Sequence, residues 1–268
     1  MADYQDIRGL RVKYLSADPG DPAAGEVWYN STTGTLKSVV QSAAWSSSSP
    51  LATARTRMFV AGTQTAALSG GGNTTASVNE TEEYNGSGWT AGGNMTTARN
   101  NGGSAGTQTA AVAAGGYTSG PGAAANRTHS EEYNGTGWTA GNPISSTPPG
   151  RSGMYQGCAG ILTSALLVGG EGPAIPGVSN LVEEYDGTNW TAGGVYPTPA
   201  YGGAVTGATG TAVITAGGVG GGAIVNTSNT YNGTSWAANP TINTTRCYMS
   251  GFGTSTASLI TGGVLPPG

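Results

Sequence analysis

Apolar residues recur along the chain in short runs, and each run ends at a pair of glycines. The pairs are Gly71-Gly72, Gly115-Gly116, Gly169-Gly170, Gly217-Gly218 and Gly262-Gly263. A branched apolar residue stands three positions before each pair, and a threonine stands six positions before it. Short apolar runs bounded by glycine are typical of β-strands. The pattern therefore predicts five strands in a shared register.

A second pattern joins a tyrosine to a tryptophan five positions later, with Asn-Gly or Asp-Gly between them. The pairs are Tyr84 and Trp89, Tyr133 and Trp138, Tyr185 and Trp190, and Tyr231 and Trp236. Asn-Gly between apolar positions is the strongest short-range signal for a hairpin. Each copy predicts a strand that ends at the tyrosine, a tight turn, and a strand that begins at the tryptophan.

The two patterns belong to one repeat. The tyrosines are spaced by 49, 52 and 46 residues, and a period of this length indicates stacked or radially arranged units. An arginine ten to thirteen residues after each tryptophan gives a third landmark: Arg55, Arg99, Arg151 and Arg246, with Tyr201 in the fourth copy. Each unit is therefore predicted to hold four strands: a after the arginine, b before Gly-Gly, c ending in Tyr, and d beginning at Trp.

This order of landmarks resembles the kelch family of β-propellers over roughly Gly25 to Gly263. The chain departs from the usual kelch repeat in its shorter Tyr-to-Trp spacing and its many Ala and Thr residues. The resemblance implies a propeller fold, and a fold of this kind hosts many functions.

The two ends of the chain predict how the ring closes. Trp45 has Val40 five positions before it but no preceding Gly-Gly pair, and Gly262-Gly263 has no Tyr or Trp after it. Strands from both termini would complete one blade and leave no exposed edge. We therefore expect an all-β, five-bladed kelch-like propeller over residues 25–268, preceded by an anchoring or flexible arm over residues 1–24.

The segment between the arm and the first blade carries its own pattern, which runs from Asp18-Pro19 through Trp28-Tyr29-Asn30 to Leu36-Lys37. It predicts strands over Val27–Asn30 and Thr35–Val40, joined by a turn. The segment is similar to a stretch found in many bacteriophage tail-fibre and virion proteins. The repeated Thr-Ala-Arg and Gly-Thr-Gln-Thr-Ala-Ala phrases look like those of kelch-like proteins of marine phages. Together these resemblances imply a phage virion protein.

The amino-acid composition limits the classes of partner that the protein could bind. Only 9% of the residues are charged and the net charge is −4, which argues against a nucleic-acid partner because such binding requires a basic surface. The sequence holds no apolar run long enough to span a membrane, and its polar start does not resemble a signal peptide. Six Trp and twelve Tyr supply the mass of a core.

Candidate catalytic residues are few. The doublets Glu82-Glu83, Glu131-Glu132 and Glu183-Glu184 are repeated, and neighbouring strand residues point to opposite faces. We expect them to be structural, with the repeated arginine as a partner. The single histidine, His129, is expected to be a solvated loop residue. A single histidine does not supply a metal cluster or a Ser-His-Asp set. We predict no catalytic, metal-binding or cofactor-binding residues and no enzymatic activity.

Two further residue classes have competing interpretations. Cys158 and Cys247 fall on strand a of non-adjacent blades and are expected to be buried thiols, the alternative being a disulfide across the ring. The tryptophans of the hairpins are expected to lie buried between blades, the alternative being sugar-stacking platforms.

Strand alternation places the short a–b and c–d turns on one face of the ring and the long, variable b–c and d–a loops on the other. Variable loops on a rigid scaffold are a common site of recognition. The leading hypothesis is a non-enzymatic virion protein, made in the bacterial host cytoplasm. It would be a tail fibre, adhesin or capsid or tail decoration, present in multiple copies in a symmetric assembly. Its expected partners are other virion proteins and, as a candidate, a host-surface glycan. The alternative is a secreted, lectin-like carbohydrate-binding propeller.

Overall fold

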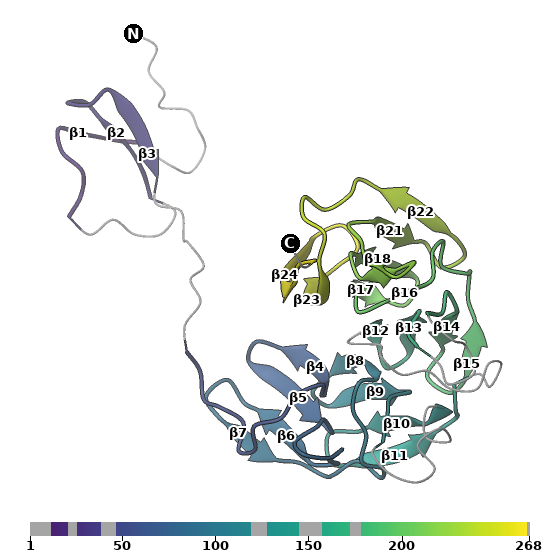
Figure 1. Ribbon diagram of the computed structural model, residues 1–268. Helices are drawn as coiled ribbons and strands as arrows, with labels where there is room; N and C mark the ends of the chain where they lie inside the picture. The colour runs from purple at the N-terminus through teal and green to yellow at the C-terminus, as the bar shows by residue number, and fades with distance from the viewer. Residues whose placement is uncertain are drawn as a thin grey trace. The chain divides into compact units, whose positions relative to one another are not determined.

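The computed structural model describes residues 12–20, 26–38, 47–118, 128–144, 157–171 and 178–266. The chain divides into two compact units, Met1–Ser47 and Ser48–Gly268, and each is described by itself. The named elements of the described residues are all β-strands (Figure 1). The all-β class predicted from the sequence is therefore confirmed.

The first unit holds a three-stranded sheet of β1 (Lys13–Leu15), β2 (Val27–Asn30) and β3 (Thr35–Ser38). Strand β2 pairs in parallel with β1 and antiparallel with β3. The predicted strand at Val27–Asn30 is confirmed. The second predicted strand is described as far as Ser38, because Val40 lies outside the described residues. Since β1, β2 and β3 form one sheet, the division falls after Ser47 and not after Ala24.

The second unit holds four antiparallel four-stranded sheets in which the strands follow one another in space as in the sequence. The first sheet is β4 (Phe59–Thr63), β5 (Ala66–Gly70), β6 (Thr81–Tyr84) and β7 (Trp89–Ala91). The second is β8 (Gly103–Thr107), β9 (Ala110–Ala114), β10 (Ser130–Tyr133) and β11 (Trp138–Gly141). The third is β12 (Cys158–Ile161), β13 (Ser164–Val168), β14 (Val182–Tyr185) and β15 (Trp190–Ala192). The fourth is β17 (Ala204–Thr209), β18 (Ala212–Ala216), β21 (Ser228–Tyr231) and β22 (Trp236–Asn239).

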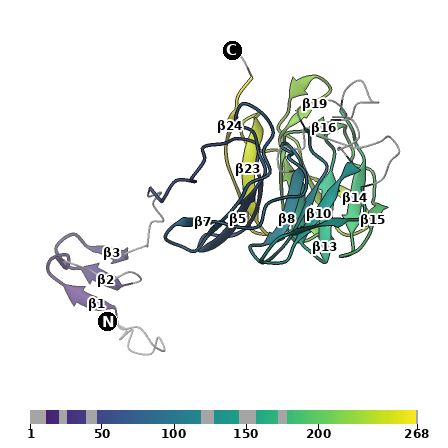
Figure 2. The same cartoon turned by 90° about the horizontal axis from the view of Figure 1, so that it is seen from below.

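Two smaller sheets hold the other named strands among the described residues of the second unit. A two-stranded sheet pairs β23 (Cys247–Gly253) with β24 (Ser258–Val264). A three-stranded sheet joins β16 (Ala200–Tyr201), β19 (Val219–Gly220) and β20 (Ala223–Ile224) within the loops of the fourth sheet. Seen edge-on in Figure 2, β16 and β19 lie at one face of the unit.

The four-strand repeat is confirmed in these four sheets. Strand b ends one residue before each of the first four Gly-Gly pairs, strand c ends at the tyrosine, and strand d begins at the tryptophan. Tyr84 pairs with Trp89 across the loop, and the Asn85 side-chain oxygen accepts hydrogen bonds from the N–H groups of Ser87 and Gly88, both at 3.0 Å. Such an Asx turn explains the asparagine or aspartate at this position. The last Gly-Gly pair differs, because β24 runs through it to Val264.

The innermost strands β4, β8, β12, β17 and β23 face a common centre (Figure 1). Residues from all five strands line a central cavity of about 210 Å³. The sheets are therefore arranged radially around this cavity. Trp45 and Val40, which the sequence assigns to a closing blade, lie outside the described residues.

The core lies between consecutive sheets. One cluster joins Phe59 and Leu68 of the first sheet, Met95 of the following loop, and Tyr133 and Trp138 of the second sheet. The inner strands are rich in Gly and Ala, which lets neighbouring sheets approach closely: a Cβ on Gly103 would lie 2.5 Å from a Leu167 methyl group. Burial of apolar area at these interfaces holds consecutive sheets together.

Candidate functional site

The long loops and the short turns lie at opposite ends of the sheets, as the sequence predicts. The b–c connections span residues 71–80, 115–129, 169–181 and 217–227, and the d–a connections span residues 92–102, 142–157, 193–203 and 240–246. The a–b turns leave two residues between strands, as at Gln64-Thr65. We call the end with the long loops the loop face, and it is the candidate binding site. The parts of these loops at residues 119–127, 145–156 and 172–177 lie outside the described residues.

Three Gly-Gly pairs, those that end at Gly72, Gly170 and Gly218, tie the start of a b–c loop to the next unit. Gly71 and Gly72 both have positive φ angles, 59° and 110°, which favour glycine. The Gly72 N–H donates to the Arg99 carbonyl at 2.8 Å, and a Cβ on Gly71 would lie 2.5 Å from that same oxygen. Side chains larger than hydrogen would therefore separate the first two sheets here.

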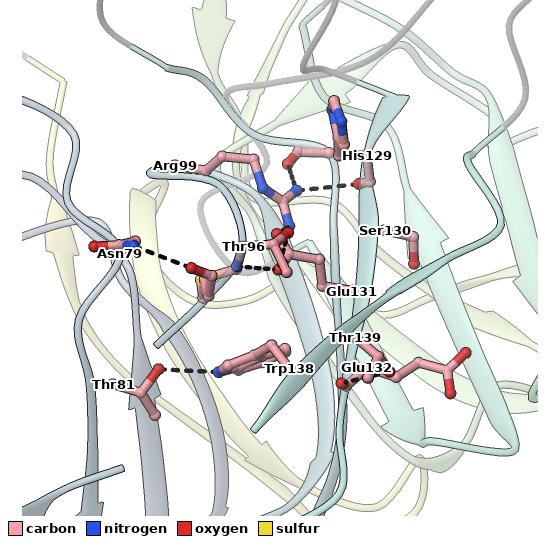
Figure 3. Close-up of polar contacts among 12 residues, drawn as sticks. Asn79, Thr81, Thr96, Arg99, His129, Ser130, Glu131, Glu132, Trp138 and Thr139 are labelled. Carbon is pink, nitrogen blue, oxygen red and sulfur yellow. Dashed lines mark hydrogen bonds and ion pairs between the residues drawn. The ribbon is translucent and has the colours of Figure 1, made fainter. Parts of the chain in front are cut away.

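A buried arginine fixes the base of each loop in the first two sheets. Arg99 Nη1 donates to the carbonyls of Gly115 and His129, the two ends of one b–c loop, the second at 3.1 Å. Its Nη2 donates to Glu131 Oε1 at 2.8 Å, and Glu131 Oε2 accepts from the Thr96 N–H at 2.6 Å (Figure 3). Burial lowers the pKa of Arg99, and the Glu131 carboxylate opposes that shift. The pair therefore satisfies the loop carbonyls and compensates the buried charge.

The first sheet repeats this arrangement. Arg55 Nη1 donates to the Glu80 carbonyl at 3.0 Å, and its Nη2 pairs with Glu82 Oε1 at 3.0 Å. Glu82 Oε2 accepts from the Ala52 N–H at 2.7 Å. The predicted pairing of the glutamate doublets with the repeated arginine is therefore confirmed for the first member of two doublets. Arg151, the expected partner in the third unit, lies outside the described residues.

The fourth sheet replaces the ion pair with an uncharged network. Gly170 N–H donates to the Ala200 carbonyl, so Ala200 takes the arginine position and the sequence alignment of Tyr201 with it is wrong by one residue. The glutamate position is Asn229, whose Nδ2 donates to the Tyr196 hydroxyl at 3.1 Å, and that hydroxyl lies 2.9 Å from Thr215 Oγ1. Arginine and glutamate are lost together, as expected when an unpaired buried charge is costly.

The second member of each doublet links neighbouring sheets. Tyr133 donates its hydroxyl proton to Glu83 of the first sheet, and Tyr185 and Tyr231 donate to Glu132 and Glu184 in the same way. Burial, followed by the hydrogen bond to Glu83, raises the pKa of Tyr133 to about 12. Sequence reasoning missed this contact, although a glutamate directly before Tyr84, Tyr133 and Tyr185 was the available signal. The two carboxylates of a doublet thus have different partners and do not form an acid–base pair.

The tryptophans of the hairpins also lie between sheets. Trp138 and Trp190 are buried, and their indole N–H groups donate to Thr81 Oγ1 at 2.9 Å and to Ser130 Oγ at 3.1 Å in the preceding sheet. Trp236 is half-buried and donates to the Gly194 carbonyl. Burial between sheets is confirmed for Trp138 and Trp190, whose rings offer no exposed face for a sugar.

The remaining candidates are structural. His129 is half-buried, its carbonyl is held by Arg99, and its Nδ1 is covered without a hydrogen-bond partner in the described part of the chain, so the expectation of a solvated residue is wrong. The expectation for the cysteines is confirmed: Cys158 and Cys247 are buried and form no disulfide. Among the described residues, no group of three or more His, Cys, Asp or Glu side chains could hold a metal ion.

In the first unit, side chains from the segment between Asp18 and Lys37 donate hydrogen bonds to one carboxylate, that of Asp18. Asp18 Oδ1 accepts from Trp28 Nε1 at 2.9 Å and from Asn30 Nδ2 at 2.8 Å, and Oδ2 pairs with Lys37 Nζ at 2.6 Å. These hydrogen bonds, the one from Lys37 first, lower the pKa of Asp18 to about 2. The other face of the sheet carries a row of Tyr14, Tyr29 and Leu36, with Tyr14 74% and Leu36 66% exposed.

Comparison with known proteins supports the fold alone. No protein-family model matches the chain, and no curated protein matches it. The solved structure of YjhT is similar, with a TM-score of 0.60 and 16% sequence identity over 79% of this chain and 78% of that one. The chain therefore has an all-β, β-propeller-like fold. Within the described residues, no helix is long and apolar enough to cross a membrane.

Proposed function

We propose that this chain is a non-enzymatic structural protein of a bacteriophage virion, a tail-fibre, adhesin or decoration protein, in which the propeller is a rigid binding or display module. The observation that carries the proposal is the hydrogen-bonded network of the first unit. The residues by which it resembles phage tail-fibre segments, Asp18, Trp28, Asn30 and Lys37, form one hydrogen-bonded network. They therefore specify a folded module that is separate from the repeat.

The first unit would act as the anchor. A three-stranded sheet this small is marginally stable without a covered apolar face. In the Tyr14–Tyr29–Leu36 row, Tyr14 and Leu36 are exposed and Tyr29 is half-buried. Contact of this row with another virion protein would cover it and attach the ring to the particle. The loop face, held by buried arginines, would then be available for outward contacts, including a host-surface glycan. Several copies in a symmetric assembly would be displayed in this way.

The ring of this proposal has five blades, the last completed by strands from both termini. Support comes from the point where the chain enters the first sheet. Asn142, four residues after Trp138, donates to the Thr188 carbonyl, two residues before the next tryptophan. Ser49, four residues after Trp45, makes the equivalent bond to the Ser87 carbonyl at 2.7 Å. The chain thus enters the first sheet as it would from the d strand of a preceding blade.

The test is the composition and structure of purified phage particles. Mass spectrometry should detect this protein as a stoichiometric component, and a reconstruction of the particle should show the first unit against another virion protein. Particles that lack the protein would overturn the proposal. A particle in which the long b–c loops are buried, with the first unit unattached, would reverse the assignment of anchor and display faces.

A further inference from the structure

Arg246 stands in the same structural position as Arg99 in the second sheet. The Gly218 N–H donates to the Arg246 carbonyl at 2.9 Å, as Gly72 does to Arg99 at 2.8 Å. Arg246 Nη1 donates to the Gly262 carbonyl at 3.4 Å, the counterpart of the Arg99 bond to Gly115. The guanidinium is therefore placed for the same contacts as its counterparts.

The backbone leading to Arg246 also follows that of the second sheet. The Ile242 N–H donates to the Asn226 carbonyl at 3.0 Å, and the Met95 N–H donates to the Asn79 carbonyl at 2.9 Å. Asn243 therefore occupies the place of Thr96, whose N–H binds the second carboxylate oxygen of Glu131. The two donors that hold a carboxylate in the first two sheets, a guanidinium and the N–H three residues before it, are both present at this position.

No ion pair of Arg246 with a carboxylate is found among the described residues. Glu82 pairs with Ser69 and Glu131 with Ala113, each two residues before a Gly-Gly pair. The corresponding residue of β24 is Ile260, and β24 has no outer neighbour among the described strands. The fourth sheet has neither the arginine nor the glutamate, whereas here the arginine is kept and no described residue supplies the acid.

We propose that Arg246 and the Asn243 N–H form a receptor at the loop face for a carboxylate group that the repeat itself does not supply. The known geometry in two other sheets defines the ligand: one carboxylate oxygen on the guanidinium and the other on the backbone N–H. Arg246 is half-buried and Asn243 is exposed, so a ligand can approach from the loops. The carboxylate would come from a small free acid or from an Asp or Glu side chain of a partner protein. This inference does not depend on the virion assignment.

The first test compares thermal melting of the full chain in sodium acetate and in sodium chloride at equal ionic strength. A ligand that binds only the folded state raises the melting temperature, and we expect acetate to raise it by about 2–4 °C relative to chloride. Acetamide, which lacks the charge, should give no rise. Arg246→Gln should abolish the acetate effect, and Arg57→Gln, which removes another cation of the loop face, should retain it. An equal effect of acetate on wild type and Arg246→Gln would overturn the proposal.

A further experiment separates the two sources of the carboxylate. A peptide with the sequence of residues 128–134 carries the Glu131 environment, and its Glu131→Gln version is the control. If the acidic peptide binds roughly tenfold or more tightly than the control and displaces acetate, the carboxylate ligand is a protein side chain. If acetate raises the melting temperature but the peptide does not bind, the ligand is a small acid.

Discussion

The Arg99 guanidinium and the Glu131 carboxylate are paired at 2.8 Å, and neither side chain is exposed to solvent. The same pair is built in the first sheet from Arg55 and Glu82. Each arginine donates to a backbone carbonyl at the base of a long loop, so the repeated arginine and glutamate of the sequence position the loop bases at the loop face.

Breaking one partner of this pair should be costly. Glu131→Gln keeps the shape but leaves the Arg99 charge uncompensated, and we expect a loss of about 3–5 kcal/mol in the free energy of unfolding. Replacing both residues, as in Arg99→Met with Glu131→Leu, should cost less than Glu131→Gln alone. Glu80→Gln, at an exposed side chain, is the control and should change stability by less than about 0.5 kcal/mol. Urea unfolding provides the measurement, and equal losses for Glu131→Gln and Glu80→Gln would contradict the argument.

Trp138 should behave as a core residue. Its ring lies between the first two sheets and is 6% exposed, so Trp138→Ala should destabilise the protein by about 3–5 kcal/mol. Thr81→Val removes only the acceptor of the indole N–H and should cost about 1–3 kcal/mol. Thermal denaturation of the two variants gives the comparison. A Trp138→Ala protein of normal stability that had lost a sugar ligand would favour the stacking interpretation instead.

Much of this architecture was readable from the sequence, because the repeat marks strand ends directly. Tyr84 and Trp89 stand at the two ends of a turn, so spacing alone placed strands c and d. The fourth arginine position could not be placed, since Ala200 is recognised only by the bond that its carbonyl accepts from Gly170. The role of Tyr196 was likewise hidden, because its hydroxyl substitutes for a guanidinium from a different place in the chain. Binding function was less readable still, since the loops carry no repeated chemistry.

The Tyr133–Glu83 contact makes stability depend on alkaline pH. The pKa of Tyr133 is raised from 10.0 to about 12 in the folded state. A raised pKa contributes stability that is fully present below the unfolded value of 10.0 and is lost as the pH rises toward about 12. In Tyr133→Phe, the free energy of unfolding should therefore fall less steeply with pH across this range. Urea unfolding from about pH 9 to pH 12 measures the profile, and identical slopes for variant and wild type would refute the assignment.

Asp18 gives the stability of the first unit the opposite pH dependence, with a loss at acidic pH. Its pKa is lowered from 3.8 to about 2 by hydrogen bonds from Lys37, Asn30 and Trp28. The stabilisation is present above pH 3.8 and is lost as the pH falls toward about 2. We expect the indole N–H resonance of Trp28 to move toward its unfolded position over this interval. In Asp18→Asn the same resonance should already be shifted at neutral pH, and a resonance that stays in place in both experiments would show that the network does not depend on the carboxylate.

The last prediction concerns ring closure. Strand β24 (Ser258–Val264) is the partner of β23, and its side chains Leu259 and Val264 are more than half exposed in the described residues. If strands from both termini complete one blade, deleting residues 259–268 removes the central strand of that blade and exposes new edges, which favours aggregation. We expect the truncated chain to aggregate or to lose cooperative melting. Deleting only residues 265–268, beyond the end of β24, is the matched control and should melt like the parent. Calorimetry with light scattering distinguishes the two, and a 259–268 deletion that melts cooperatively at the parent temperature would rule out the shared closing blade.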